Sequence, residues 1–479
     1  MHPDMRMILD ISNETLFFYY LASNLIYLAL LVVALLSSRA HHQHLASLRL
    51  ERMKLSPLTP PITLVAPAHN EEGSIIPSVR SLLRIDYPEL EVVVVNDGSK
   101  DRTLAKLTEE FQLQRARIVY IPQIPSAPVR GIYRSLRDPR LIVVDKEPGG
   151  SKADAVNAGL NAATSPYTCV VDADSILESD ALLRIMVKIL EDPKRVIAAG
   201  GIVRVLNGCE LSGGKIRRVS LPKSPMVTIQ VIEYLRAFLI GREAWGRGNM
   251  LTIISGAFGV FRRDVILSVG GFRAEAIGED FDLVARIHRK MLEEKRDYRI
   301  TFVPDPVCWT EVPPTAKSLA RQRARWQKGL LDTLWLNRGM LFQRKYGRIG
   351  WLAFPYMWIF ELLAPALELA GIATIALAAI LGVLNRTFFW EFMIYGYLFA
   401  AMISVGAVLQ EEVTYRRYND WRDVARLIFF CFLEQFPYRQ LHLTWRLQGM
   451  WQYARGDVVW RPVERVGLES AAPSPRTQA

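Results

Sequence analysis

The chain has 479 residues, enough for a soluble domain of roughly two to three hundred residues together with membrane segments. Its 59 Lys and Arg residues outnumber its 48 Asp and Glu residues, and the resulting net charge of +11 favours anionic partners such as nucleotide phosphates or acidic lipids. The four cysteines lie far apart in sequence and form no C-x-x-C pair, which excludes a secreted disulfide framework and predicts four reduced thiols.

The first predicted element is a membrane-spanning helix over Leu16–Ser38. This segment carries no charge and is longer than the about 20 apolar residues that a helix needs to cross a bilayer. A cleaved signal peptide is the alternative, but Asp4 and Asp10 precede the apolar run where such a peptide has cations. The basic flank RAHHQHLASLRLERMK places the next domain in the cytoplasm by the positive-inside rule.

A soluble α/β domain is predicted over 60–316, after a first region of 1–45. We expect strands in ITLVAPA, LEVVVVND, ARIVYIP, YTCVVDAD and RVIAAGGIV, because the strands of a parallel sheet covered on both faces are apolar throughout. GSIIPSVRSLL and SDALLRIMVKILED have helical spacing. The segments Gln123–Gly150 and Leu206–Pro225 are rich in Gly, Pro, Arg and Ser and predict long loops.

Three further regions follow this domain. We expect amphipathic interfacial helices over 317–348 and transmembrane or re-entrant segments over 349–441, in which Gly350–Leu384 and Phe388–Leu409 form an out-and-back pair. The next apolar run, RLIFFCFLEQFPYRQLHL, is short and interrupted, so it could cross the membrane, re-enter it or lie along it. A basic cytoplasmic tail over 442–479 ends in a disordered AAPSPRTQA.

Acidic residues end two of the predicted strands, where open α/β sheets bind their ligands. Asp97 ends VVVVND, and Asp172 and Asp174 end YTCVVDAD. Taken singly, each of them is explained as a turn or a helix cap. Two carboxylates on one side of an extended strand end would hold Mg²⁺ or Mn²⁺ together with a diphosphate.

Other candidate residues stand at the predicted starts of helices. EPGGSKADAVNAG places Lys152 where backbone N–H groups and a cation could receive phosphate, although a plain basic loop is the better interpretation of that segment alone. Neither a Walker loop nor a dinucleotide-binding G-x-G-x-x-G is present. Glu279 and Asp280 begin a helix as caps or as a general base. Gln322, Arg325 and Trp326 share one helix face.

Together these motifs resemble family 2 glycosyltransferases of the processive type, such as poly-β-N-acetylglucosamine, hyaluronan and cellulose synthases. The resemblance covers Thr63 to Gly329 and depends on the order of VAPAHNEE, VVVVNDGS, GGSKADAVNAG, VVDAD, SGAFGVFRRD, GED and Q-x-x-R-W. It implies a GT-A (Rossmann-like) α/β glycosyltransferase domain in the cytoplasm, flanked by transmembrane helices. GED stands where many members have TED, and SGAFG replaces a more usual Cys-Gly loop.

The resemblance implies a role for each matching residue. The implied donor-binding residues are Asp97, at the uridine end, and Lys152, Asp172 and Glu71, and the implied metal ligands are Asp172 and Asp174. The implied catalytic residues are Asp280, which deprotonates the acceptor, and Glu279. The residues implied to bind the acceptor and the diphosphate are Gln322, Arg325 and Trp326. The implied cofactor is Mg²⁺ or Mn²⁺. The implied reaction is transfer with inversion from a UDP-sugar to a growing β-linked polysaccharide.

Several partners and alternatives follow from these expectations. We expect a multi-pass protein of the inner (plasma) membrane that contacts lipids and a polysaccharide or lipid-linked acceptor, with a small membrane or export subunit left open. A non-processive transferase that adds one sugar is the first alternative, and Q-x-x-R-W argues against it. A transporter component has too few predicted spans. Nucleic-acid binding would depend on charge alone, and we expect none.

Overall fold

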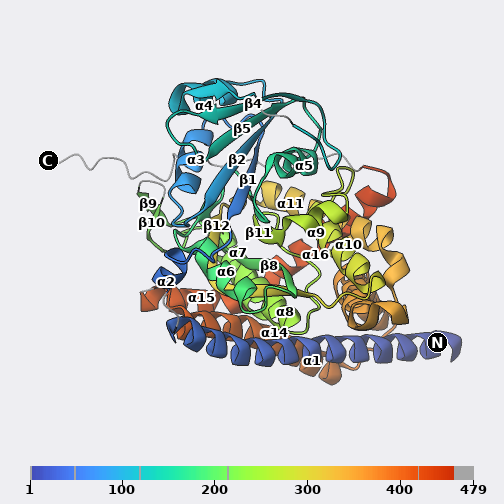
Figure 1. The fold of residues 1–479 in the computed structure, drawn as a ribbon. Helices are drawn as coiled ribbons and strands as arrows, with labels where there is room; N and C mark the ends of the chain where they lie inside the picture. The colour runs from blue at the N-terminus through green and yellow to red at the C-terminus, as the bar shows by residue number, and fades with distance from the viewer. Residues whose placement is uncertain (1–2, 48–49, 118–119, 213–214, 419, 458–479) are drawn as a thin grey trace. The chain divides into compact units, whose positions relative to one another are not determined.

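The computed structural model describes residues 3–47, 50–117, 120–212, 215–418 and 420–457 (Figure 1). Contacts divide the chain into two units. Among the described residues, the sheet unit comprises Ala40–Lys223 and Trp245–Pro313, and the helical unit comprises 3–39, Ser224–Ala244 and 314–457. The predicted tail lies outside the described residues from 458 onward, and the other predicted domain boundaries stay predictions.

A mixed ten-stranded sheet forms the core of the sheet unit. Its strands are β1 (Ile62–Ala68), β2 (Leu90–Asp97), β3 (Leu113–Arg115), β4 (Val129–Ser135), β5 (Leu141–Lys146), β6 (Tyr167–Val171), β7 (Ile176–Leu177), β8 (Val196–Val205), β11 (Phe258–Arg262) and β12 (Arg299–Thr310). They lie in the order β3-β4-β5-β2-β1-β6-β11-β8-β12-β7. A small separate hairpin pairs β9 (Glu210–Ser212) with β10 (Lys215–Arg218).

The direction of the strands differs from the predicted all-parallel sheet. Neighbours β5, β2, β1 and β6 run parallel, and so do β8 and β12. β11 runs antiparallel to both β6 and β8, and β4 runs antiparallel to β5. The predicted parallel pairing is therefore correct for β5, β2, β1 and β6 and for the pair β8 and β12, and wrong where β11 and β4 are inserted antiparallel. Apolar burial on both faces requires covered strands without setting their direction.

One predicted strand is wrong, although the other four predicted runs form β1, β2, β6 and β8. The described residues of ARIVYIP lie after the end of β3, and only the N–H of Ala116 still bonds to β4, at the carbonyl of Ile132 (2.8 Å). Just after this segment, the side chain of Asn161 accepts from the N–H groups of Gln123 (2.8 Å) and Ile124 (3.1 Å), so the backbone there bonds to a side chain and not to a strand.

Both predicted loops contain strands. Gln123–Gly150 includes β4 and the fully buried β5, and Leu206–Pro225 includes β9 and β10. The composition of the whole segment obscured LIVVDK, a β-branched run that pairs with the central strand β2. The error matters for function, because β5 ends at a lysine close to the candidate site.

Helices cover both faces of the central strands, and Figure 1 shows α3 and α5 on opposite sides of β1 and β2. The helices of the sheet unit are α2 (Leu50–Lys54), α3 (Ile75–Leu83), α4 (Thr103–Phe111), α5 (Lys152–Ala162), α6 (Ala181–Leu190), α9 (Arg263–Ser268) and α10 (Glu279–Glu293), and α8 (Glu243–Arg247) begins in the helical unit. The two predicted helical runs form α3 and α6. α5 packs closely on the sheet at Gly159, whose missing side chain leaves room for Val65 and Val95.

A buried histidine fixes α10, the helix that carries two candidate residues at its start. Nε2 of His288 donates to the carbonyl of Leu251 (2.8 Å), so Nδ1 accepts from the hydroxyl of Tyr298 (2.6 Å). The ring is fully buried, and this desolvation lowers the pKa of His288 to about 4. The folded protein therefore contains His288 as a neutral imidazole at neutral pH.

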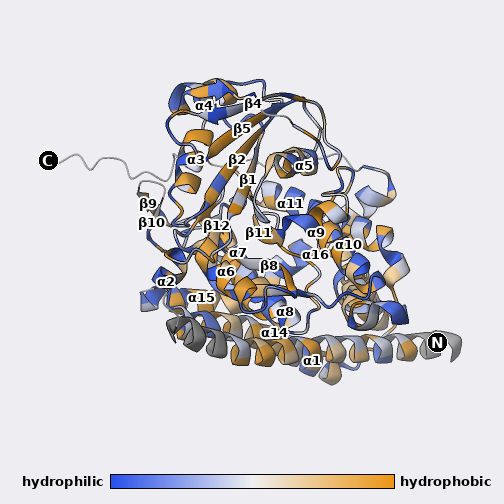
Figure 2. Ribbon diagram, in the orientation of Figure 1, coloured by the Kyte–Doolittle hydropathy of each residue, from blue (hydrophilic) through white to orange (hydrophobic). Residues whose placement is uncertain are grey.

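The helical unit contains the apolar segments. Its main helices are α1 (Pro3–Ser47), α7 (Pro225–Leu235), α11 (Ala316–Leu336), α12 (Phe354–Tyr356), α13 (Ala364–Ile380), α14 (Arg386–Thr414), α15 (Trp421–Leu433) and α16 (Arg439–Ala454). Short 3-10 and π-helical segments connect them: η1 (Arg236–Arg242), η2 (Arg338–Met340), η3 (Arg344–Tyr346), η4 (Ile349–Ala353), η5 (Met357–Leu362) and η6 (Glu434–Tyr438). Figure 2 shows the hydrophobic colour along much of α1.

Within the described part of the chain, two helices are long and apolar enough to cross a membrane, Ile11–Ser38 within α1 and Arg386–Thr414. They contain the predicted spans Leu16–Ser38 and Phe388–Leu409. The predicted block Gly350–Leu384 is broken, since Ile349–Leu362 and Ala364–Ile380 meet at a bend of 46° and form either one broken span or a re-entrant loop. The apolar run RLIFFCFLEQFPYRQLHL is interrupted at η6, where Pro437 removes a backbone donor and Phe436 leaves helical geometry.

We predict that Gly159→Ala destabilises the sheet unit. A Cβ at this position would lie 2.4 Å from Cγ1 of Val65 and 3.0 Å from Cγ2 of Val95, which forces α5 away from the sheet. Overpacking of this kind costs about 1–3 kcal/mol. Thermal unfolding of the detergent-solubilised protein should show the loss, whereas Gly73→Ala, which meets nothing within 4 Å, should unfold like the wild type.

We also predict that acid destabilises the protein through His288. Because its folded pKa of about 4 lies below the unfolded value of 6.5, its contribution is complete above pH 6.5 and is lost as the pH falls toward 4. The difference corresponds to about 3 kcal/mol. The free energy of unfolding should be measured between pH 7.5 and 4.5. It should fall less with decreasing pH for His288→Gln than for the wild type, and equal slopes would contradict this role.

Candidate functional site

Two clusters of charged side chains lie at one edge of the sheet. β1, β2, β5 and β6 are parallel neighbours, so the residues that follow their carboxyl ends meet at the same edge. α5 also begins there, capped by Ser151, whose hydroxyl accepts from the N–H of Asp154 (3.3 Å). We name the clusters after their cations, the Lys152 cluster and the Lys146 cluster.

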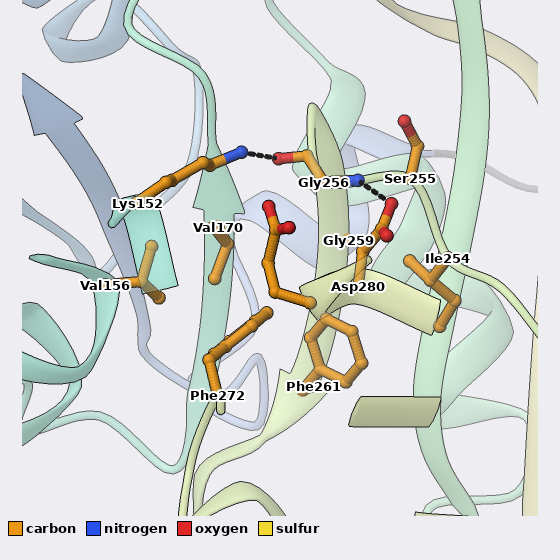
Figure 3. Close-up of a pocket in the computed structure, with 11 residues that line it drawn as sticks. Lys152, Val156, Val170, Ile254, Ser255, Gly256, Gly259, Phe261, Phe272 and Asp280 are labelled. Atoms are coloured by element: carbon orange, nitrogen blue, oxygen red, sulfur yellow. Dashed lines mark hydrogen bonds between the residues drawn. The ribbon is translucent and has the colours of Figure 1, made fainter. Parts of the chain in front are cut away.

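The Lys152 cluster joins the start of α5 to the turn after β6 and the start of α10. Nζ of Lys152 donates to the carboxylate of Asp172 and to the carbonyl of Gly256 (2.8 Å). The N–H of Gly256 in turn donates to Oδ2 of Asp280 (3.1 Å). Figure 3 shows Lys152 and Asp280 on either side of Gly256. The structure therefore brings together four predicted site residues, because Glu279 also acts on Lys152 through its charge.

The charge of Lys152 is stabilised by its neighbours. Burial alone would lower the pKa of this ammonium, but the carboxylates of Asp172, Glu279 and Asp280 outweigh that effect and raise the pKa of Lys152 above its usual value. The group is thus a fixed cation at neutral pH. A cation held between carboxylates at a pocket is suited to bind an anionic ligand in their place.

A pocket opens beside this cluster, with an apolar wall and a charged side. Its lining residues are Lys152, Val156, Val170, Ile254, Ser255, Gly256, Gly259, Phe261, Phe272, Glu279 and Asp280. Figure 3 shows the aromatic rings of Phe261 and Phe272 below the carboxylate of Asp280. An apolar wall with a few convergent polar groups is typical of a small-molecule site.

Two backbone amides orient Asp280. Its Oδ1 accepts from the N–H of Phe281 (2.8 Å) in the first turn of α10, and its Oδ2 accepts from Gly256. The predicted helix start at Glu279 and Asp280 is confirmed by the bounds of α10. This carboxylate is held in one position beside the pocket, as a general base requires.

The two predicted metal ligands are not arranged as the sequence predicted. Asp172 to Ser175 form a turn, with the N–H of Ser175 bonded to the carbonyl of Asp172 (3.0 Å), rather than an extended strand end. The carboxylate of Asp172 is about one quarter exposed, and Asp174 is buried. Within the part of the chain that the structure describes, no group of three or more His, Cys, Asp or Glu forms a metal site.

The Lys146 cluster contains Asp97. Nζ of Lys146 lies 2.5 Å from Oδ1 of Asp97 and 2.6 Å from Oδ1 of Asp154, and Lys146 is fully buried. The sequence motifs did not single out Lys146 and Asp154, although LIVVDK ends in polar residues just as VVVVND does. Glu71 follows β1 at the same edge, where its N–H donates to Thr103 (2.9 Å) and its carboxylate accepts from Ser74.

The remaining predicted residues belong to the helical unit. Gln322, Arg325 and Trp326 lie on α11 as predicted, and Trp326 is 43% exposed. Arg323, which the sequence did not single out, stacks over the ring of Trp326 at 4.5 Å and forms an ion pair with Glu233 of α7 (2.6 Å). These contacts orient the exposed indole.

Comparisons with known proteins identify the family. The model described as glycosyl transferase family 2 matches residues 63–124, and the one described as glycosyltransferase like family 2 matches residues 127–329. These matches together span more than half of the chain. The chain belongs to glycosyltransferase family 2. Its sheet unit has the GT-A fold, as the resemblance implied.

Curated relatives of the chain are polysaccharide synthases. The poly-beta-1,6-N-acetyl-D-glucosamine synthase of Staphylococcus aureus (strain MSSA476) is 29% identical over 270 residues, which are 56% of this chain and 54% of that protein. The corresponding synthase of Staphylococcus epidermidis is 28% identical over 280 residues, 57% of this chain and 56% of that protein. The chain thus spans about half the length of the curated relatives that it matches.

Solved structures align with the chain at low identity. The mannosyltransferase PcManGT from Pyrobaculum calidifontis, in complex with GDP-Man and Mn²⁺, is 22% identical, with a TM-score of 0.48 and coverage of 85% of this chain and 98% of that chain. S. aureus TarS 1–349 is 16% identical, with a TM-score of 0.38 and coverage of 83% and 92%. The family assignment depends on the sequence matches.

We predict that Gly256→Ala impairs turnover without unfolding the protein. A Cβ here would lie 3.2 Å from Nζ of Lys152 and 3.7 Å from Oδ2 of Asp280, so the ammonium must shift by a few tenths of an ångström. Small displacements of reacting groups reduce rates strongly, and we expect about a tenfold fall in kcat. Steady-state turnover with Gly73→Ala as control tests this, and an unchanged kcat would show that the site tolerates the shift.

Proposed function

We propose that the protein is a membrane-embedded inverting glycosyltransferase that transfers sugar from a UDP-sugar to a growing β-linked polysaccharide. The observation that carries this proposal is the Lys152 cluster, in which an oriented aspartate and a fixed cation border one pocket. Family membership supplies the reaction class. A polymer of N-acetylglucosamine is favoured because the curated relatives are poly-β-1,6-N-acetylglucosamine synthases.

Asp280 is the proposed base. It accepts the proton of the acceptor hydroxyl, whose oxygen attacks the anomeric carbon while the bond from that carbon to the diphosphate oxygen breaks, so the configuration inverts. UDP leaves with the electrons of that bond. Gly256 and the first turn of α10 hold Asp280 for this step, and Glu279 stands beside it.

Lys152 is the proposed cation for the donor. Its ammonium is paired with Asp172 and is available to exchange this partner for a phosphate oxygen at the start of α5, where backbone N–H groups also favour anions. Asp97 is proposed to contact the uridine end, with Glu71 in the neighbouring turn. Gln322, Arg325 and Trp326 are proposed to bind the acceptor sugar and the diphosphate.

The proposed metal site consists of Asp172 and Asp174. Carboxylate oxygens suit Mg²⁺ or Mn²⁺, and two of them leave most positions of such an ion to diphosphate and water oxygens. When bound, the ion would stabilise the negative charge of the departing diphosphate. Lys152 would have to release Asp172 for this, and a phosphate offers the ammonium a new partner.

The proposal extends to the membrane. α1 and α14 contain the candidate spans, and the basic flank after Ser38 favours a cytoplasmic sheet unit in a multi-pass protein of the inner membrane. Trp326 on α11 supports a processive enzyme, since an exposed indole offers the growing chain a flat apolar surface. Translocation of the polymer by the same protein belongs to this proposal.

We predict that Asp280→Asn abolishes transfer while the fold persists. Loss of a general base lowers rates by about 10²- to 10⁴-fold. UDP release and product size should be followed in purified membranes offered UDP-N-acetylglucosamine, UDP-glucose or UDP-glucuronate with Mg²⁺ or Mn²⁺. The control is Asp264→Asn, which changes an aspartate in the first turn of α9 that is largely exposed and paired with Arg262 (2.6 Å).

Each outcome distinguishes a different enzyme. A high-mass product from the wild type and from Asp264→Asn, absent with Asp280→Asn, supports a processive synthase and names its sugar. A single-sugar, lipid-extractable product would instead establish a non-processive transferase. Full activity in Asp280→Asn would remove that residue from the base position.

A further inference from the structure

Three oxygens of the protein surround the ammonium of Lys146. Nζ donates to Oδ1 of Asp97 (2.5 Å) and to the carbonyl of Glu147 (2.7 Å), and Oδ1 of Asp154 lies 2.6 Å away as an ion-pair partner. The side chain is also fully buried. Lys146 therefore acts on other groups of the protein and does not touch a bound substrate.

The Lys146 cluster connects four segments that the chain brings from different places. Asp97 ends β2, Lys146 ends β5, and Asp154 lies in the first turn of α5. Oδ2 of Asp154 also accepts from the N–H of Ala127 (2.9 Å). A charge buried among these groups holds them in one arrangement, because moving any of them would leave an unpaired ion away from water.

Asp97 is left with one oxygen for other contacts. Its Oδ1 accepts from Lys146 and from the N–H of Gly149 (3.0 Å). Among the described residues, no donor bonds to its Oδ2, and the side chain keeps a small exposed fraction of 11%. The lysine thus fixes both the charge and the direction of the oxygen that a ligand can reach.

We propose that Lys146 is a positioning residue that determines the nucleobase of the donor. This inference rests on the proposed function, in which Asp97 contacts the uridine end of the donor. A carboxylate locked as a pure acceptor selects a base that presents an N–H, as uracil does at N3. Cytosine presents an unprotonated nitrogen at that position, whose lone pair is repelled. Sites built to receive a hydrogen bond reject analogues that lack the donor.

The test separates this role from general support of the fold. Affinities for UDP and CDP are measured by calorimetry on the purified full-length protein. The decisive variant is Lys146→Met with Asp154→Asn, which removes one positive and one negative charge and so keeps the net charge of the cluster. The control is Lys188→Met, which removes a surface lysine paired with Glu191 on α6 (2.6 Å).

We expect the wild type and Lys188→Met to bind UDP at least tenfold more tightly than CDP. In the double variant UDP affinity should fall about tenfold, whereas CDP affinity should change less than threefold, so the preference is lost. An equal loss of affinity for UDP and CDP, or an unchanged preference for UDP, overturns the proposal. Should the double variant not fold, Lys146→Arg decides, because a planar guanidinium cannot donate from one point to three acceptors: a partial fall in preference supports the proposal and none overturns it.

Failure of this inference is distinct from failure of the proposed function. If the wild type turns over a UDP-sugar and the double variant keeps its preference for UDP, only the proposed role of Lys146 is contradicted. A wild type that turns over no UDP-sugar removes the proposed function, and with it the reason to place a nucleobase at Asp97.

Discussion

Pairing of two lysines with carboxylates at one edge of the sheet is the constraint on which the candidate site depends. Lys146 ends β5 and Lys152 begins α5, and each is bonded to an aspartate at the carboxyl end of a parallel strand. Away from water an unpaired charge is costly, so strands, turn and helix must meet in one arrangement. The two lysines differ in use, because Lys146 is fully buried, whereas Lys152 borders the pocket.

Close approach of backbones makes this arrangement accessible to a ligand. Gly256 uses both its N–H and its carbonyl, one toward Asp280 and the other toward Lys152, and a side chain there would crowd the ammonium. Gly159 plays the corresponding part behind the site, where α5 rests on β1 and β2. The candidate site therefore depends on positions that carry no side chain.

Charge pairing also organises the helical unit. Glu233 of α7 bonds to Arg323 of α11 and accepts from the hydroxyl of Tyr438 (2.9 Å), and Arg236 is paired with Glu434 (2.6 Å). Such contacts hold together helices whose outer surfaces are apolar. They also place Arg323 over Trp326, so the orientation of an exposed aromatic residue follows from a buried ion pair.

The sequence by itself determined the α/β core, the apolar spans and most candidate residues, because hydrophobic periodicity, helix caps and motif order are local signals. Four of five predicted strands formed, and Lys152 and Asp280 stand at helix starts as expected. Only the tertiary structure decided strand direction, the turn at Asp172 and the buried role of Lys146. Those features depend on which distant segments pair. The partner of a buried charged residue is set by the tertiary structure, and no local sequence signal identifies it.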